Sequence, residues 1–179
     1  ADGVGWGRPA AHRLTLFDAE EENLRIALDW WAGEGKRQPE RLLRLVCALE
    51  PCWFARGRFA AGEAACLGAI AATAEAGDTP ERGDAHVCAS TFVRSRGDHA
   101  GAGRLLTEAG RIYAAVGDAD GAAEALIERG YVALRVRDLP GARGFLQEAL
   151  RLFHTLGDAL GAASARSLLG LVALGEEQT

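Results

Sequence analysis

The sequence contains no methionine, and lysine occurs only once, at Lys36. A chain without methionine cannot begin at its own start codon, so we expect a processed protein or a piece of a longer one. No apolar run approaches the roughly 20 residues that span a bilayer, and no basic segment followed by an apolar stretch opens the chain. These absences argue against a membrane protein and leave no visible signal peptide, so we expect a cytoplasmic protein.

Positive charge is scarce as well. The 179 residues include 20 basic and 25 acidic side chains, which gives a net charge of −5, and the isoelectric point is near 5.4. Because affinity for nucleic acid depends on basic side chains that neutralise phosphates, we expect no direct binding of DNA or RNA.

Motifs that carry catalysis or hold cofactors are also missing. The chain has no G-x-S-x-G elbow, no phosphate loop of the Walker type, no H-E-x-x-H and no C-x-x-C pair. We therefore predict no enzymatic activity, no cofactor and no metal site. The cysteines have apolar neighbours and are expected to be reduced, buried thiols. They are Cys47, Cys52, Cys66 and Cys88.

Glycine, in contrast, is abundant, with 23 residues, and its positions are periodic. Four Gly-Asp pairs and one Arg-Asp pair follow a spacing of 20 residues, at 77–78, 97–98, 117–118, 137–138 and 157–158. Gly57 extends this period one step upstream. Glycine takes the left-handed conformation that ends a helix, and aspartate accepts hydrogen bonds from the free amides that open the next helix. The period therefore predicts short turns between helices of about 17 residues.

The segments between the turns have helical periodicity and no sustained apolar–polar alternation, which predicts an all-α protein. The expected helices are Asp18–Ala32, Glu40–Arg56, Phe59–Ala76, Pro80–Arg96, His99–Val116, Ala119–Val136, Leu139–Leu156 and Ala159–Ala173. Residues 1–13 are predicted to be a linker and residues 14–179 the helical repeat domain. Within that domain, residues 33–39 are expected to form a longer loop and residues 175–179 a frayed tail.

Equivalent positions in successive helices carry similar residues. Ala102, Ala122, Ala142 and Ala162 share one position, Leu106, Leu126 and Leu146 a second, and Gly110, Gly130 and Gly170 a third. We expect the small residues to lie where helices cross closely. The full repeat is predicted to be a pair of helices of 40 residues.

This pattern resembles the tetratricopeptide repeat, which pairs a small residue in the first helix of a unit with alanines in the second. Two units have this spacing: Gly130, Ala142 and Ala149 in one, and Ser90, Ala102 and Ala109 in the other. The resemblance implies an α-α superhelix of about eight antiparallel helices. The unit is longer than the usual repeat of about 34 residues, and Glu50 and Gly62 depart from the motif in the first unit.

A second resemblance concerns the N-terminal helices. The string Glu20-x-x-Asn23-Leu24-Arg25-x-Ala27-Leu28-Asp29-Trp30 is similar to the helix that opens the repeat region of large actinobacterial transcriptional regulators. These are the LuxR-type and related ATPase-containing regulators. Residues 53–58, with Trp53, Phe54, Gly57 and Arg58, resemble them too. The resemblance implies a nucleotide-binding module before this array in a longer chain.

In such a superhelix the first helix of each pair lines a concave face. The alignment of the repeats places there Arg44, Cys47, Asp84, Val87, Thr91, Arg94, Glu124, Ile127, Tyr131, Leu134 and Arg135. This mixed surface suits a peptide segment, a neighbouring domain or a polar small-molecule effector. The Lys/Asn pattern by which some relatives hold a C-terminal carboxylate is absent, so we do not expect that ligand.

The main functional hypothesis is a protein-interaction and effector-sensing domain of a larger bacterial transcriptional regulator, which uses this concave face. The alternative is a free-standing repeat scaffold that bridges partner proteins. Four aromatic residues, Trp30, Trp31, Trp53 and Phe54, are expected to pack in an N-terminal cap. The alternative is that these aromatic residues form an exposed apolar patch that binds a preceding module.

Overall fold

The computed structural model describes residues 11–33 and 38–178, and these residues are helical almost throughout. They form nine α-helices and one 3₁₀ helix: α1 (Ala11–Ala19), α2 (Glu21–Ala32), α3 (Pro39–Ala55), α4 (Phe59–Ala72), η1 (Ala74–Ala76), α5 (Pro80–Ser95), α6 (His99–Val116), α7 (Ala119–Arg135), α8 (Leu139–Leu156) and α9 (Ala159–Glu177). This part of the chain contains no strand, so the all-α prediction is confirmed. None of its helices is both long and apolar enough to cross a membrane.

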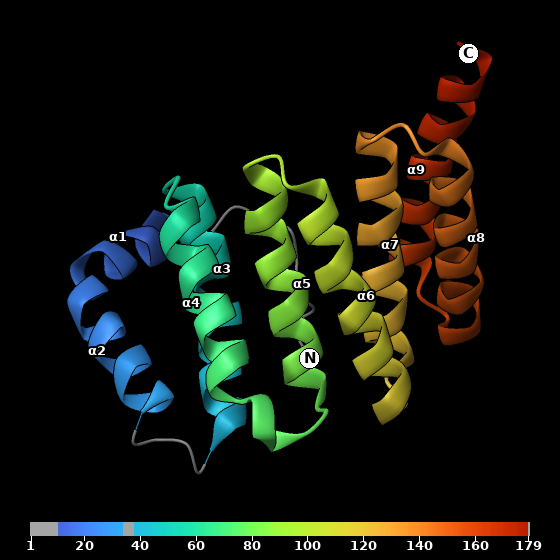
Figure 1. Cartoon of the computed structure of the whole chain (residues 1–179). Helices are drawn as coiled ribbons and strands as arrows, with labels where there is room; N and C mark the ends of the chain where they lie inside the picture. The colour runs from blue at the N-terminus through green and yellow to red at the C-terminus, as the bar shows by residue number, and fades with distance from the viewer. Residues whose placement is uncertain (1–10, 34–37, 179) are drawn as a thin grey trace.

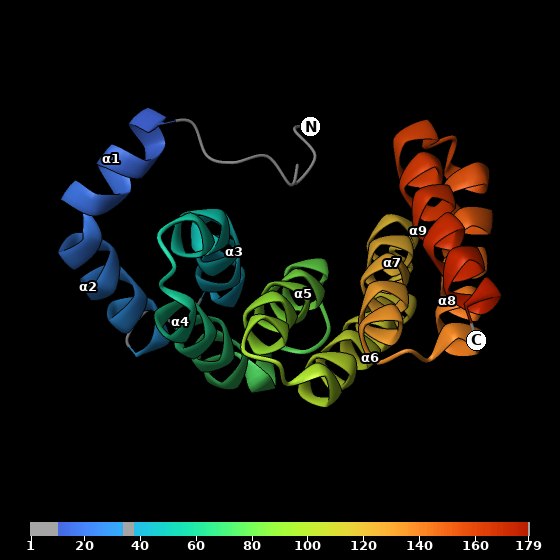
Figure 2. The same ribbon diagram turned by 90° about the horizontal axis from the view of Figure 1, so that it is seen from above.

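The helices stack side by side into a curved superhelix (Figure 1). Helices α3 and α4, α5 and α6, and α7 and α8 form successive hairpins, and each hairpin contacts the next. Figure 2 shows the arc from above, with α3, α5, α7 and α9 on its inner side and α4, α6 and α8 on its outer side. Contacts of α3 with α5, α5 with α7 and α7 with α9 continue along the inner side. The predicted α-α superhelix of 40-residue helix pairs is thus confirmed.

All six predicted turn positions have a positive φ angle. The φ angle is 67° at Gly57, 82° at Gly77, 91° at Gly97, 73° at Gly117, 61° at Arg137 and 74° at Gly157. An aspartate then caps the helix that follows in four cases: Asp98 accepts from the Gly101 amide, Asp118 from Gly121, Asp138 from Gly141 and Asp158 from Leu160, at 2.7–3.0 Å. The periodic turns predicted from the sequence are therefore present, including the one without glycine.

Asp78 is the exception to this capping pattern. Helix α5 begins two residues later, and Thr79 is its N-cap, accepting a hydrogen bond from the Arg82 amide at 3.3 Å. Asp78 instead accepts two hydrogen bonds from the Arg111 guanidinium, at 2.8 and 2.7 Å. The prediction that every Gly-Asp aspartate opens a helix is wrong here, because a threonine-proline pair supplies the cap and the fixed first turn.

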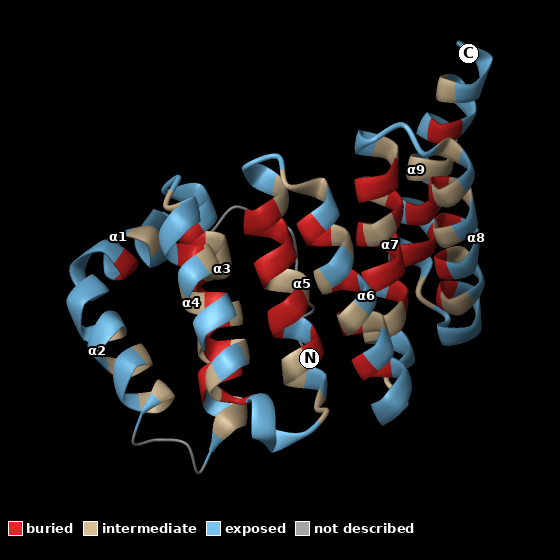
Figure 3. Cartoon of the chain, viewed as in Figure 1, coloured by how far each residue is buried: buried red, intermediate tan, exposed pale blue. Residues whose placement is uncertain are grey.

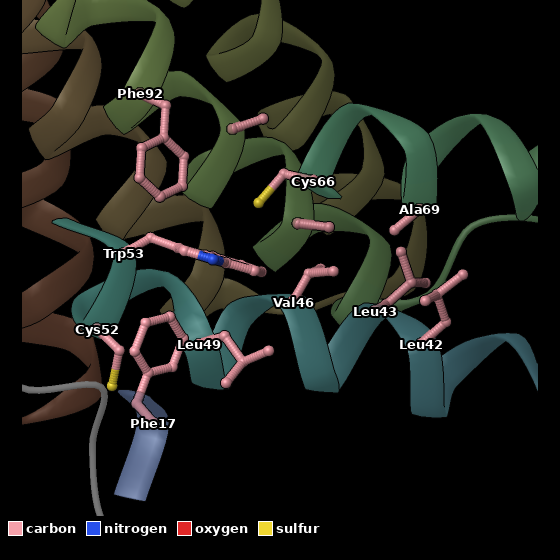
Figure 4. Packing of buried hydrophobic residues seen from close by; sticks show 12 residues of the cluster. Phe17, Leu42, Leu43, Val46, Leu49, Cys52, Trp53, Cys66, Ala69 and Phe92 are labelled. Atoms are coloured by element: carbon pink, nitrogen blue, oxygen red, sulfur yellow. The ribbon is translucent and has the colours of Figure 1, made fainter. Parts of the chain in front are cut away.

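The core is divided into clusters along the arc rather than gathered at one centre. The N-terminal cluster joins α1, α3, α4 and α5 around Trp53, whose ring lies edge-on between Phe17, at 6.3 Å, and Phe92, at 6.4 Å (Figure 4). The C-terminal cluster joins α7, α8 and α9 around Leu146 and Phe153. In Figure 3 the buried faces of the helices point toward their neighbours in the stack. Each helix pair is thus stabilised by its own contacts and by those with the pairs beside it.

Small residues permit the closest helix contacts at only some of the predicted positions. A β-carbon added at Gly130 would lie 2.5 Å from Leu146 Cγ, so this glycine allows α7 to approach α8. At Gly110 and Gly170 an added β-carbon would meet nothing within 4 Å. The prediction of a close crossing is confirmed at Gly130 and wrong at the other two positions, which face open space.

Several predicted boundaries were wrong at the N-terminal end. Residues 11–13, predicted as linker, belong to α1, because Leu14 and Phe17 of that helix pack against the N-terminal core; residues 1–10 lie outside the described part. The helix predicted at 18–32 is divided at Glu20, so the described residues hold nine α-helices rather than eight. Of the predicted loop at 33–39, Pro39 opens α3, and residues 34–37 lie outside the description.

Two later boundaries also differ. The helix predicted to end at Ala76 ends at Ala72, where the Arg82 guanidinium donates to the carbonyl oxygens of Ile70 and Thr73, both at 3.0 Å. The tail predicted to fray is helical to Glu177. An ion pair between Arg143 of α8 and Glu176 holds this last turn.

Candidate functional site

The inner helices α3, α5 and α7 carry the ten residues predicted to bind a partner. Arg44, Asp84, Glu124 and Arg135 are exposed, Val87, Arg94, Tyr131 and Leu134 are half-buried, and Thr91 and Ile127 are buried. The two buried residues pack between helices and offer almost no surface. The remaining eight are available to a ligand to differing degrees.

Two of these residues are held by contacts within the protein. Arg44 of α3 donates from Nε and Nη2 to Glu81 Oε1 of α5, at 3.1 and 2.5 Å. Asp84 accepts a hydrogen bond from the Tyr113 hydroxyl of α6 at 2.7 Å. Both contacts join neighbouring helices, so these side chains also brace the stack.

Arg94 occupies the middle of the inner surface. Its guanidinium carbon lies 4.5 Å from the centroid of the Tyr131 ring, in cation–π contact. Its Nη2 lies 3.5 Å from Glu128 Oε2, where the two side chains are 18% and 8% exposed. Arg94 of α5 is therefore bound to α7 by a nearly buried ion pair and an aromatic ring.

Glu50 of α3 belongs to the same group. Burial and, to a lesser extent, the negative charge of Glu128 raise the pKa of Glu50 to about 7, against the opposing effect of Arg94. We call Glu50, Arg94, Glu128 and Tyr131 the central ionic cluster. It joins three successive inner helices, α3, α5 and α7.

The hydrogen bonds of this cluster are incomplete. Among the described residues, Glu128 Oε2 and Arg94 Nε are buried atoms with no hydrogen-bond partner. The 3.5 Å separation of the Arg94–Glu128 pair is too long for a hydrogen bond between nitrogen and oxygen. Burial raises the pKa of Glu128, and the neighbouring Glu124 adds to this effect. When both carboxyl groups are ionised, the cluster has more negative charge than its single guanidinium offsets.

Sequence reasoning missed Glu50 and Glu128 as site residues. Glu128 looked like one more charge on an amphipathic helix, and only the fold shows that it is buried. A signal for Glu50 was present, because the positions 40 and 80 residues later hold the small residues Ser90 and Gly130. A carboxylate at a position that is otherwise small was noted only as a departure from the repeat.

The cysteines differ in their burial. Cys52 and Cys66 are buried and Cys47 and Cys88 half-buried, and all four are free thiols. A hydrogen bond with the Cys47 thiol, together with burial, raises the pKa of Cys88 well above its usual value. The four thiols are not joined in the structure, and the prediction of burial holds for two of them. The described residues contain no group of three potential metal ligands.

A shallow groove of about 470 Å³ lies among α6, α7 and α8. Its lining includes Val136, which is exposed, and Phe145, whose ring lies 4.0 Å beneath the Arg129 guanidinium carbon. Of the N-terminal aromatic residues, Trp53 is in the core, whereas Trp30 and Phe54 are 49% and 45% exposed. Core packing thus accounts for Trp53 but not for Trp30 and Phe54.

No family model matches the chain, and no curated protein matches it. Among solved structures, it is similar to the crystal structure of BtubC (BKLC) from P. vanneervenii, with a TM-score of 0.73 and 18% sequence identity. The match covers 92% of this chain and 66% of that chain, so this chain spans just under two thirds of the length of its structural neighbour. At this identity the likeness shows a common fold.

Proposed function

We propose that this chain is a binding domain without enzymatic activity, and that its concave face holds a polypeptide segment of a partner or of a neighbouring domain. The observation that carries the proposal is the central ionic cluster, which lies on the inner side of the superhelix with unmet hydrogen bonds. A curved stack of helix pairs presents an extended surface of this kind to a ligand. The exposed Glu124 and Arg135 extend the polar surface of α7 on either side of the cluster.

The wider setting belongs to the same proposal. The similarity of residues 20–30 to the helix that opens the repeat region of actinobacterial regulators supports a role inside a larger cytoplasmic transcriptional regulator. Binding of a segment or effector would then change how the array docks on its neighbours, by shifting the populations of two arrangements. Nucleic acid would be bound elsewhere in such a protein, because the inner surface of this domain is acidic at its centre.

The test is a selection from a random peptide library displayed on phage, followed by mapping of the binding face. The selected peptides are measured by fluorescence anisotropy against the native domain and two variants, Glu124→Arg and Glu148→Arg. Both glutamates are exposed, but Glu124 lies on the inner helix α7 and Glu148 on the outer helix α8. The two variants therefore make the same change of charge on opposite faces.

We expect Glu124→Arg to weaken binding about tenfold or more, which corresponds to roughly 1.4 kcal/mol, and Glu148→Arg to change it little. The melting temperature of each variant shows that the fold is intact. Peptides that bind both variants alike, or that respond only to Glu148→Arg, would contradict the use of the concave face.

A further inference from the structure

The central ionic cluster differs from the site around Arg111 in its hydrogen bonds. Arg111 also serves two carboxylates, but it forms hydrogen bonds with both, with Asp78 at 2.8 and 2.7 Å and with Glu108 at 2.8–3.0 Å. In the cluster a single guanidinium, that of Arg94, lies 3.5 Å from Glu128 and also interacts electrostatically with Glu50. Glu124, one helical turn before Glu128, adds a third carboxylate. The site is therefore short of positive charge.

The cluster is also short of hydrogen-bond donors at a buried atom. The side chain of Glu128 is 8% exposed, and its Oε2 accepts no hydrogen bond within the described structure. A buried carboxylate oxygen without a donor is costly, since it has lost its water and gained no replacement. A positively charged donor would supply both the missing hydrogen bond and the missing charge.

The surroundings of this oxygen suit a guanidinium or ammonium group. Glu50, Arg94 and Tyr131 are all half-buried and belong to the inner helices α3, α5 and α7, so the cluster is partly accessible to solvent. The Tyr131 ring already binds one guanidinium, that of Arg94, at 4.5 Å. An aromatic ring beside carboxylates is a favourable environment for a cation that leaves water.

We propose that the central ionic cluster is a recognition pocket for an arginine or lysine side chain of the partner segment, which donates to Glu128 and Glu50. This inference rests on the proposed function and adds the chemistry of the residue that is recognised. The Arg94 guanidinium is attached to Glu128 by a contact of 3.5 Å rather than by a hydrogen bond, and it turns aside to admit the incoming cation. The new donor forms the hydrogen bond that Arg94 does not make.

The test uses the tightest-binding peptide from the display selection described above. Each lysine of this peptide is first changed to arginine, and each arginine is then replaced in turn by citrulline, which keeps the shape of the side chain and removes its charge. Binding of the arginine peptide and of each citrulline peptide is then measured to the native domain and to the variants Glu128→Gln and Glu50→Gln. Glu148→Gln, on the outer face, is the control. We expect one citrulline change to weaken binding to the native domain at least about tenfold.

The decisive result is the coupling between the peptide and the protein. In Glu128→Gln the same citrulline change should weaken peptide binding almost no further. In Glu148→Gln it should weaken binding as much as it does in the native domain. Citrulline peptides that bind as tightly as arginine peptides would overturn the proposal. Additive losses of binding free energy from the citrulline change and from Glu128→Gln would overturn it too. Arginine amide that competes as well as the whole peptide would also overturn it, in favour of a small cationic effector.

The outcomes separate this inference from the proposed function. Selected peptides that are weakened by Glu124→Arg but contain no essential cation leave the concave binding face standing and refute the cation pocket. Peptides that are insensitive to Glu124→Arg refute the binding face itself.

Discussion

Arg137 is the residue whose backbone is least suited to its position. Its φ of 61° lies in the left-handed region, and it is the only non-glycine residue with a positive φ in the described chain. A side chain at this conformation costs about 1 kcal/mol relative to glycine. The turn forms nevertheless, because Asp138 caps α8 and its amide donates to the Ala133 carbonyl at 2.9 Å.

Substitution of Arg137 by glycine is therefore expected to stabilise the protein by about 1 kcal/mol. Arg135→Gly is the matched control, since it removes the same charge from the last residue of α7, where glycine should destabilise by up to about 1 kcal/mol. Urea denaturation of both variants measures the difference. A decrease in stability for both would show that the left-handed conformation of Arg137 carries no strain.

Glu50 gives the protein a dependence of stability on pH near neutrality. Its pKa of about 7 in the folded chain lies above the ordinary value of 4.5. Below pH 4.5 the carboxyl group is protonated in both states, and above that pH the unfolded chain ionises first. Stability therefore falls as the pH rises from about 4.5 to 7, by a total of roughly 3 kcal/mol, and then levels off.

Glu50→Gln should remove most of this loss, so that the urea midpoint changes less between pH 5 and pH 8 than in the native protein. The stability of this variant will still fall somewhat as the pH rises, because burial also raises the pKa of Glu128 and of Glu124. Glu148→Gln, on the outer face, should leave the pH profile of the native protein unchanged. An unchanged profile for Glu50→Gln would mean that this carboxylate ionises normally.

At the scale of the helices, the crossing of α7 and α8 depends on Gly130. Leu146 Cγ fills the space that a β-carbon at this position would occupy, at 2.5 Å, and both residues are buried. Gly110 in α6 is also helical but has open space around it. These two glycines occupy the same position in the 20-residue period, but Gly110 lies on an outer helix and Gly130 on an inner one, and their packing differs.

Gly130→Ala is expected to destabilise the protein by about 1–3 kcal/mol, because the leucine or a helix must move. Gly110→Ala is expected to stabilise it by up to about 1 kcal/mol, since alanine is the better helix former. Thermal unfolding, monitored by circular dichroism, measures both changes in stability. Equal effects would show that α7 and α8 do not pack as closely as the structure describes.

The sequence predicted the elements that depend on adjacent residues and missed those that depend on contacts between distant residues. The turns at 97–98, 117–118 and 157–158 follow from two adjacent residues each, and they were predicted correctly. The first helix depended on Phe17 reaching Trp53, a contact between distant residues, and its start was missed. Glu50 and Glu128 were missed for the same reason, since their environment exists only when α3, α5 and α7 stack.

At the scale of the whole molecule, the divided core predicts that stability is local. The N-terminal cluster around Trp53 and the C-terminal cluster around Phe153 share no buried residue. In a linear stack of repeats, each unit is stabilised by its own contacts and by those with its neighbours. A defect at one end should therefore be felt mainly at that end.

Phe153→Ala tests this, because it empties the C-terminal cluster at a cost of about 3–5 kcal/mol. Hydrogen exchange followed by mass spectrometry should show a large loss of protection in α8 and α9 and a small one in α3 and α4. Leu156→Ala, at an exposed site in the same helix, is the control and should change exchange little. A uniform loss of protection along the chain would show that the superhelix unfolds as a single unit.

A crystal structure of the domain with a selected peptide would show directly whether the concave face binds a cationic segment. The peptide is expected to lie along α3, α5 and α7, with an arginine or lysine side chain within hydrogen-bond distance of Glu128 and with Arg94 displaced. A peptide bound in the groove among α6, α7 and α8, or against the exposed residues of α9, would contradict this expectation.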